Sequence, residues 1–169
     1  ILPRLLADMT TEGPYSPNAK AAGKRSLGNA LLDLLSRLDD GAAATKQYAN
    51  ANNMTMQLAG LVALLQCGKG KNQSKAFRNQ WRSDRLVMDK WFSLTVSLAA
   101  PKMAAKTAEL LTQDDDFEFK NPNRFRAVFG SLASNSAGFH DASGVSYRLL
   151  GDWLAKLDAV NPQTAARCA

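Results

Sequence analysis

Apolar residues recur every three or four positions along nearly the whole chain, which is the spacing of amphipathic helices. The pattern is clearest between the Pro14–Pro17 turn region and Gly41, where lysine, arginine, asparagine, aspartate and serine fall between the apolar positions. Those apolar positions are Leu27, Ala30, Leu31, Leu34, Leu35 and Leu38. We therefore predict an amphipathic helix that has these residues on its apolar face and that ends at Gly41.

The same spacing predicts further helices along the chain, over residues 42–51, 56–65, 74–82, 86–99, 101–111, 121–132 and 147–157. Asn53 or Thr55 is the expected N-cap of the helix over 56–65. Pro101 suits the first position of the helix over 101–111. Residues 95–98 alternate as a strand would, so the helix prediction there depends on the neighbouring residues. Residues 114–119 are expected to form a solvated acidic linker with a short extended stretch.

Helices of this length joined by short loops, without a strand repeat, indicate an all-α fold. The helices come in pairs of similar length, which favours stacked antiparallel helix pairs in a solenoid-like superhelix. No repeated sequence motif accompanies these pairs, so a plain helical bundle remains an alternative.

Composition excludes several classes of protein. With 46% hydrophobic and 21% charged residues, the chain is neither disordered nor fibrous. No apolar stretch is long enough to predict a membrane span, and Cys67 and Cys168 lack the spacing of a metal or redox motif. We expect free thiols, a cytoplasmic location and no membrane partner. The chain begins at Ile1, and we expect it to be a fragment of a longer protein.

The residues needed for catalysis are sparse. His140 is the one histidine, so the chain alone cannot supply the two imidazoles of a His-Glu-x-x-His zinc site. We expect His140 to be a turn residue bonded to backbone. The sequence Gly68-Lys69-Gly70-Lys71 lacks the spacing of a phosphate-binding loop. We therefore predict no catalytic residue and no cofactor in this chain.

Several short motifs occur in a fixed order and together resemble one known family. They are Lys24-Arg25-Ser26-Leu27-Gly28-Asn29, Asn52-Asn53-Met54-Thr55, Leu86-Val87-Met88-Asp89-Lys90-Trp91-Phe92, Asn121-Pro122-Asn123-Arg124-Phe125-Arg126, Phe139-His140, and Asn161-Pro162-Gln163 with Ala166-Arg167. The series is similar to the C-terminal helical domain of bacterial-type aminopeptidase N, and it covers about residues 15–168. The match departs from the family at 143–147, where the family tends to have Gly-Ser-Gly-Tyr.

The resemblance implies a role without catalysis. Members of that family are zinc metallopeptidases that remove N-terminal residues from peptides, and their zinc lies in a separate catalytic domain. The C-terminal domain closes over that catalytic domain, so the implied partners are the catalytic domain and peptide substrates. By resemblance, Arg126 and Arg167 would line the substrate chamber, since a guanidinium can pair with a peptide carbonyl or carboxylate.

The resemblance also implies domain boundaries. Residues 1–16 would be an N-terminal segment leading into the domain, and residues 17–169 would be part of the C-terminal helical domain, with its final helices missing. The alternative is a stand-alone basic helical module that binds protein or nucleic acid, based on the net charge of +6. Its basic residues would be Lys69, Lys71, Lys75, Arg78, Arg82 and Arg85, with Phe77 and Trp81 between them. We disfavour nucleic acid, because the basic residues form no dense run.

Overall fold

The computed structural model describes residues 1–11 and 13–169, and every regular element in these ranges is a helix. This confirms the all-α prediction. The chain divides into two compact units, Ile1–Ala76 and Phe77–Ala169, which are described separately below. None of the helices in the described ranges has the length and apolar character required to span a bilayer.

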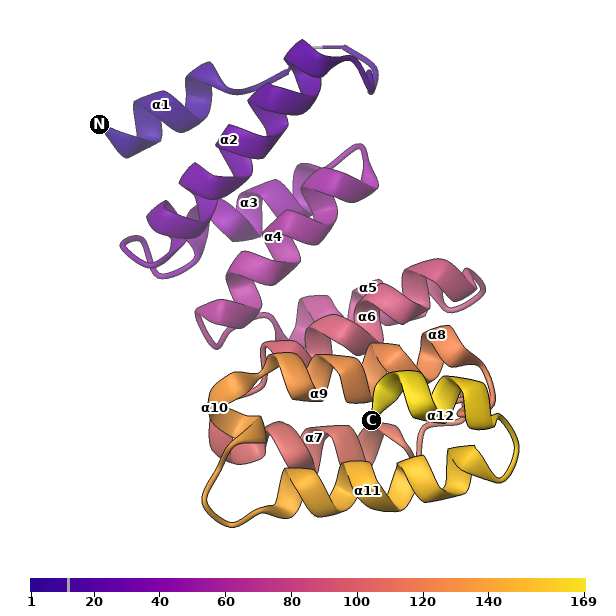
Figure 1. Cartoon of the computed structure of the whole chain (residues 1–169). Helices are drawn as coiled ribbons and strands as arrows, with labels where there is room; N and C mark the ends of the chain where they lie inside the picture. Colours follow the sequence, from indigo (N-terminus) through magenta and orange to yellow (C-terminus); the bar gives the residue numbers. More distant parts are fainter. Residues whose placement is uncertain (12) are drawn as a thin grey trace. The chain divides into compact units, whose positions relative to one another are not determined.

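The first unit is built from helices that follow one another along the chain (Figure 1). They are α1 (Leu2–Asp8), α2 (Ala19–Ser36), α3 (Ala42–Asn50), α4 (Met54–Gln66) and the first part of α5 (Lys71–Trp81). Helix α2 packs against α1, α3 and α4, and α3 packs most extensively on α4. Helix α1 lies in the segment 1–16, where the sequence analysis predicted no helix.

Local signals set the helix ends as the sequence indicates. The Asn53 side chain accepts a hydrogen bond from Met56 N at 3.1 Å, which makes Asn53 and not Thr55 the N-cap of α4. Gly41 adopts φ +80, a left-handed conformation that side chains disfavour, and α3 starts directly after it. Helix α2 already ends at Ser36, so Leu38 lies in the turn and not in the helix that we predicted to reach it.

The predicted apolar face of α2 is largely wrong. Leu27, Leu34 and Leu38 remain 52%, 53% and 76% exposed. The buried residues of α2 are Arg25, Gly28, Leu32 and Ser36, which repeat at the same helical spacing on another face. Leu32 belongs to the core of this unit with Ala44, Ala63 and Leu64. Both faces of α2 fit a helical period, so only contacts with α3 and α4 select the buried one.

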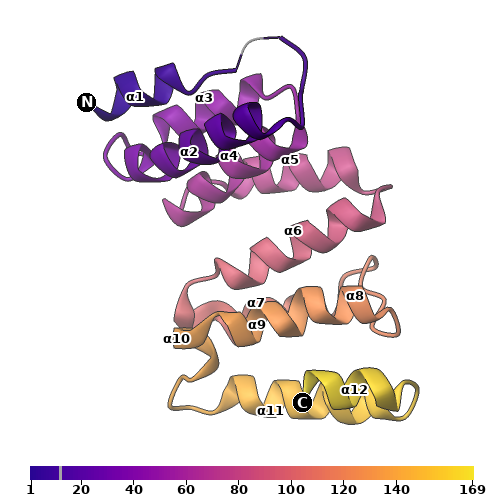
Figure 2. The ribbon, with the colours of Figure 1, turned by 45° about the horizontal axis from the view of Figure 1, so that its top comes forward.

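The second unit stacks its helices in successive layers, with α6 followed by α7 and α9 and then by α11 and α12 (Figure 2). Its elements are α6 (Arg85–Ser97), η1 (Pro101–Met103), α7 (Ala104–Leu111), α8 (Pro122–Phe125), η2 (Arg126–Gly130), α9 (Ser131–Ser134), α10 (Ser136–Phe139), α11 (Val145–Asp158) and α12 (Pro162–Cys168). Residues 95–97 belong to α6, which confirms the helix over the strand alternative. Pro101 opens η1, which continues into α7 as predicted.

An aromatic cluster forms the core of the second unit. The ring centroids of Phe125 and Phe129 are 4.7 Å apart, and the ring of Trp153 lies 5.6 Å from that of Phe129. Phe117 completes the cluster, with its centroid 5.5 Å from Trp153 and 6.3 Å from Phe92. The cluster joins α6, α8, η2 and α11, and it holds the segment after α7 against them. Trp91 is buried as well, and Trp153 packs within this cluster.

Gly138 lets α10 approach α7 and η1 closely. A Cβ atom at this position would lie 2.6 Å from the Ala104 Cβ and 2.7 Å from the Pro101 carbonyl oxygen. We expect Gly138→Ala to lower the free energy of unfolding by about 1–3 kcal/mol, because the backbone must move to relieve the overlap. Chemical denaturation of the two proteins measures the difference.

The matched control is Gly151→Ala in α11, where a Cβ would meet no atom within 4 Å. Alanine there should raise the free energy of unfolding by about 0.5–1 kcal/mol, because glycine weakens a helix interior. A loss of stability in both variants would contradict the steric explanation for Gly138.

Candidate functional site

The segment after Asn121 carries the first predicted site residue. The Asn121 side chain accepts a hydrogen bond from Asn123 N at 3.0 Å, and Pro122 occupies the first turn, so α8 begins as the sequence indicates. The α-helical pattern then changes to a π-helical turn, η2, which begins at Arg126 and ends at Gly130. Such turns are rare in helices and often occur at functional sites.

Arg124 is a buried structural residue. Its Nε lies 2.5 Å from Asp89 Oδ1 on α6, and the side chain of Arg124 is 6% exposed. Its remaining nitrogens donate to the carbonyl oxygens of Asp116 and Arg85. The guanidinium also stacks over the Phe92 ring, 4.4 Å from its centroid. The contacts with Asp89, Arg85 and Phe92 tie α8 to α6. Each nitrogen of the buried guanidinium has a partner within the protein, which makes Arg124 a structural residue.

Arg126, two positions later, is exposed. It donates one hydrogen bond, from Nη2 to Asn123 Oδ1 at 2.7 Å, within its own turn. This bond orients the side chain and leaves other N–H groups of the guanidinium to face solvent. The motif Asn-Pro-Asn-Arg-x-Arg therefore contains two arginines with different roles, and Arg126 is the one that a ligand can reach.

Arg167, the second predicted site residue, lies in the last turn of α12 and is exposed. The Asn161 side chain caps this helix by accepting a hydrogen bond from Thr164 N at 3.0 Å, and α12 packs on α11. The structure thus presents two exposed arginines, Arg126 at the start of η2 and Arg167 in the last turn of α12.

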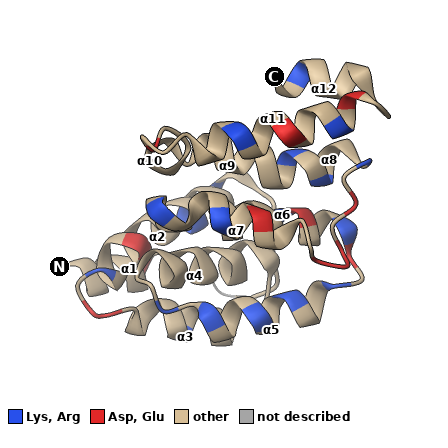
Figure 3. Cartoon of the chain, turned by 90° about the horizontal axis from the view of Figure 1, so that it is seen from below, with Lys and Arg blue, Asp and Glu red and all other residues tan. Residues whose placement is uncertain are grey.

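Figure 3 shows several basic residues along α5. Two of the basic residues of the alternative hypothesis, Arg78 and Arg82, form ion pairs. Arg78 contacts Asp114 at 2.7 Å and Asp116 at 2.9 Å, and Arg82 contacts Asp116 at 2.9 Å. Phe77, predicted to lie between them on a binding face, is fully buried. These contacts leave fewer free cations for nucleic acid. They also correct the prediction of a solvated acidic linker, since Asp114 and Asp116 are half-buried in ion pairs with Arg78 and Arg82, whereas Asp115 is exposed.

The ion pairs of Asp116 make stability depend on pH. Burial alone would raise the pKa of Asp116, but hydrogen bonds from Arg82 and Arg78 outweigh burial and lower this pKa below its ordinary value of 3.8. A lowered pKa stabilises the fold above the carboxyl pKa of the unfolded chain, and this contribution disappears as the pH falls through the folded pKa. We expect Asp116→Asn to be less stable than wild type at neutral pH, with the difference shrinking from about pH 4 downward.

Urea denaturation at a series of pH values measures this difference. Asp152→Asn on α11 is the control, since Asp152 is exposed and has no ion pair among the described residues. A constant difference between wild type and Asp116→Asn across the acid range would contradict the ion-pair explanation.

His140 follows α10 and pairs with a side chain. Its Nδ1 contacts the Tyr147 hydroxyl, and both rings pack with Phe139. The position in a turn agrees with the prediction, but the expected bond of the ring to backbone is replaced by the bond to Tyr147. This arrangement joins the end of α10 to α11.

The residues of the described chain do not fit a zinc centre. No group of three or more histidine, cysteine, aspartate or glutamate side chains is placed so that it could hold a metal ion in the described part of the chain. Both cysteines are free thiols, and Cys67 Sγ lies 3.3 Å from the Ser36 carbonyl oxygen.

Arg25 is a charged residue that the sequence did not indicate as a site residue. It lies on the buried face of α2, 5% exposed, and lines a cavity in the first unit. The only signal in the sequence is its position three residues before Gly28 and seven before Leu32, which places all three on one helical face.

Comparison with known proteins places the chain in a family. The family model described as "Domain of unknown function (DUF3458_C) ARM repeats" matches residues 1–169. Its description as a helical repeat agrees with the predicted stack of helix pairs. A solved structure, that of Legionella pneumophila aminopeptidase A in complex with aspartic acid, superposes with a TM-score of 0.87 at 27% identity, covering 99% of this chain and 21% of that one.

Curated relatives give the same result. Aminopeptidase N of Caulobacter vibrioides is 40% identical over 174 residues, which is 99% of this chain and 20% of the relative. Aminopeptidase N of Escherichia coli is 36% identical over 164 residues, which is 92% of this chain and 18% of the relative. The chain thus spans about one fifth of the length of the curated relatives that it matches. It belongs to the DUF3458_C family of ARM-repeat domains, and nearly all of it is similar to part of bacterial aminopeptidase N.

Proposed function

We propose that this chain is part of the non-catalytic C-terminal helical domain of a cytoplasmic zinc aminopeptidase that removes N-terminal residues from peptides. In this proposal the domain closes over the catalytic domain and lines the substrate chamber. The zinc belongs to the catalytic domain, because the residues described in this chain do not form a metal site. The match over one fifth of each aminopeptidase N is consistent with a domain of a longer enzyme.

The observation that carries the chamber-lining role is the contrast between Arg124 and Arg126. The buried Arg124 donates to Asp89 and to backbone carbonyls, whereas the exposed Arg126 has one hydrogen-bond partner among the described residues, Asn123. An oriented guanidinium with free N–H groups suits a peptide carbonyl or carboxylate. Arg167, exposed in the last turn of α12, is the second residue proposed to face the chamber.

Exposed leucines on and just after α2 support the docking of another domain. Leu27 and Leu34 lie on α2, Leu38 lies in the turn that follows, and the described residues leave all three exposed. In the proposal, part of the longer polypeptide covers these residues.

Replacement of Arg126 in the intact enzyme tests the proposal. We expect Arg126→Ala to raise the KM for tripeptides and tetrapeptides about tenfold, since one charge-assisted hydrogen bond is lost. The kcat for an alanyl arylamide, which has no carboxylate to reach Arg126, should stay within about twofold. Arg167→Ala is expected to act in the same direction.

Arg148→Ala is the matched control, because Arg148 is also exposed but donates to the Ser143 carbonyl oxygen of its own turn. An equal change of KM in Arg148→Ala, or no change in Arg126→Ala and Arg167→Ala, would contradict the chamber-lining role. Absence of peptidase activity in the intact protein would contradict the enzyme assignment itself.

A further inference from the structure

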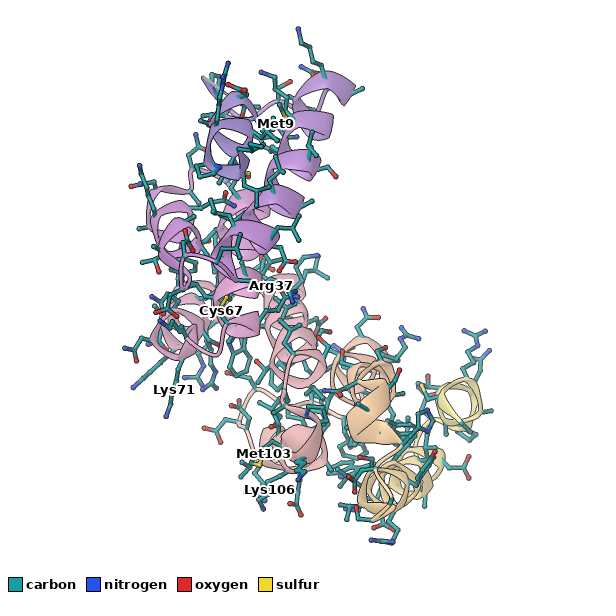
Figure 4. The ribbon with its side chains drawn as sticks, turned by 90° about the vertical axis from the view of Figure 1, so that its left-hand side faces the viewer. Met9, Arg37, Cys67, Lys71, Met103 and Lys106 are labelled. Atoms are coloured by element: carbon teal, nitrogen blue, oxygen red, sulfur yellow. The ribbon has the colours of Figure 1, made fainter. Side chains whose placement is uncertain are left out.

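A cavity of about 510 Å³ lies in the first unit, among α1, α2, α3 and the start of α4. This volume is within the usual range for a site that binds a small molecule. One wall is apolar and includes Leu6, Leu32, Leu35 and Met56. Met9, labelled in Figure 4, also lines the cavity, next to Gly28 of α2. The cavity can therefore take an apolar group.

Arg25 lines the same cavity from α2 and is 5% exposed. Its guanidinium stacks on the Tyr15 ring, 4.5 Å from the centroid, which covers one face of the planar group. Among the described residues, no hydrogen bond or ion pair to the Arg25 side chain occurs. Its nitrogens are not buried atoms that lack a partner, so they remain accessible to solvent. Its N–H groups thus keep access to the cavity. A buried charge without a partner is costly, so an anion in the cavity would stabilise it.

The rest of the described lining carries no opposing charge. Lys46 on α3 adds a second cation, and no aspartate or glutamate is among the described residues that line the cavity. The Gln47 side-chain nitrogen donates to Met56 O at 3.0 Å and to Asn29 Oδ1 at 3.1 Å, which holds α3 against α2 and α4. Hydrogen bonds therefore hold α2, α3 and α4 together around the cavity, and the positive charges of Arg25 and Lys46 lie beside its apolar lining.

We propose that this cavity is a binding site for a small organic carboxylate with an apolar body, with Arg25 as its anchor. The planar fork of a guanidinium pairs with a carboxylate through two parallel hydrogen bonds, and Lys46 adds attraction at long range. The apolar wall of Leu6, Leu32 and Leu35 receives the body of the ligand. The described residues that line the site all fall between positions 3 and 56, within the first unit.

Isothermal titration of the intact protein that contains this chain tests the site, with N-acetyl-L-leucine as the probe. Its blocked amino group prevents it from acting as an aminopeptidase substrate. N-acetyl-L-leucine amide is the matched ligand without a carboxylate, and we expect it to bind at least tenfold more weakly. The Arg25→Gln variant should lose at least tenfold in affinity for the acid and show little change for the amide.

Lys46→Gln keeps the test decisive if Arg25→Gln fails to fold, because Lys46 is exposed and its replacement leaves the core intact. We expect it to weaken binding of the acid about threefold. Equal binding of acid and amide, or unchanged affinity in both variants, would overturn the proposal. Glu12 lies outside the described residues and is replaced separately. If N-acetyl-L-leucine binds only to the Glu12→Gln variant, the carboxylate of Glu12 already pairs with Arg25, and the proposal is wrong.

Discussion

Replacement of Arg124 by alanine is expected to lower the free energy of unfolding by about 3–5 kcal/mol. The change leaves the carboxylate of Asp89, whose side chain is 17% exposed, without its partner in a poorly hydrated place. It also removes the donors to the carbonyl oxygens of Asp116 and Arg85, and the packing of the guanidinium on Phe92. Urea denaturation at neutral pH, followed by circular dichroism, measures the loss.

Arg126→Ala is the matched control from the same helical segment. Arg126 is exposed and bonds only within its own turn, so its replacement should change the free energy of unfolding by no more than about 0.5 kcal/mol. The double variant Arg124→Met with Asp89→Leu should recover much of the loss, because the unpaired buried charge is then removed. Equal effects of Arg124→Ala and Arg126→Ala would contradict the separation of structural and exposed arginines.

Truncation of Phe129 to alanine is expected to cost about 3–5 kcal/mol as well. Phe129 is 1% exposed, and its ring packs against Phe125 and Trp153. Removal of the ring leaves a cavity that the surrounding helices cannot fill, because its aromatic neighbours on α8, on α11 and in the segment after α7 are held by their own contacts. Thermal and urea denaturation give the size of the effect, and tryptophan fluorescence reports the change around Trp153.

Leu110→Ala on α7 serves as the comparison, since Leu110 is 52% exposed. Its free energy of unfolding should change by no more than about 0.5 kcal/mol. A loss below about 1 kcal/mol for Phe129→Ala would contradict a tightly packed aromatic core in the second unit.

The two arginines of one short motif show how stability and function separate in this domain. If Arg124 holds α8 on α6, its variants reduce the folded population and lower activity indirectly. Arg126 variants should instead leave stability unchanged and alter the KM for peptides. Measurement of both quantities on both variants therefore distinguishes a structural residue from one that contacts substrate.

The sequence by itself determined the class of fold and many helix ends. Helical periodicity predicted helices over 56–65, 101–111 and 147–157, and the structure has α4, η1 with α7, and α11 there. These features are local, since a cap or a proline acts on residues within one turn of itself. The short α1 lacked such periodicity and was missed, because two turns of helix give too few repeats to detect.

Only the tertiary structure decided which face of α2 is buried and which charges are paired. Leu27 and Leu32 are equally apolar, and contacts with α3 and α4 bury the second and leave the first exposed. Arg124 and Asp89 lie 35 positions apart, and Arg78 and Asp114 lie 36 apart, so no local pattern predicts that either pair meets. The cavity beside Arg25 likewise forms where α1, α2, α3 and the start of α4 meet. Periodicity specifies a helix, but long-range packing determines which residues its side chains contact. These contacts decide whether an arginine is buried in the structure, as Arg124 is, or exposed and able to bind a ligand, as Arg126 is.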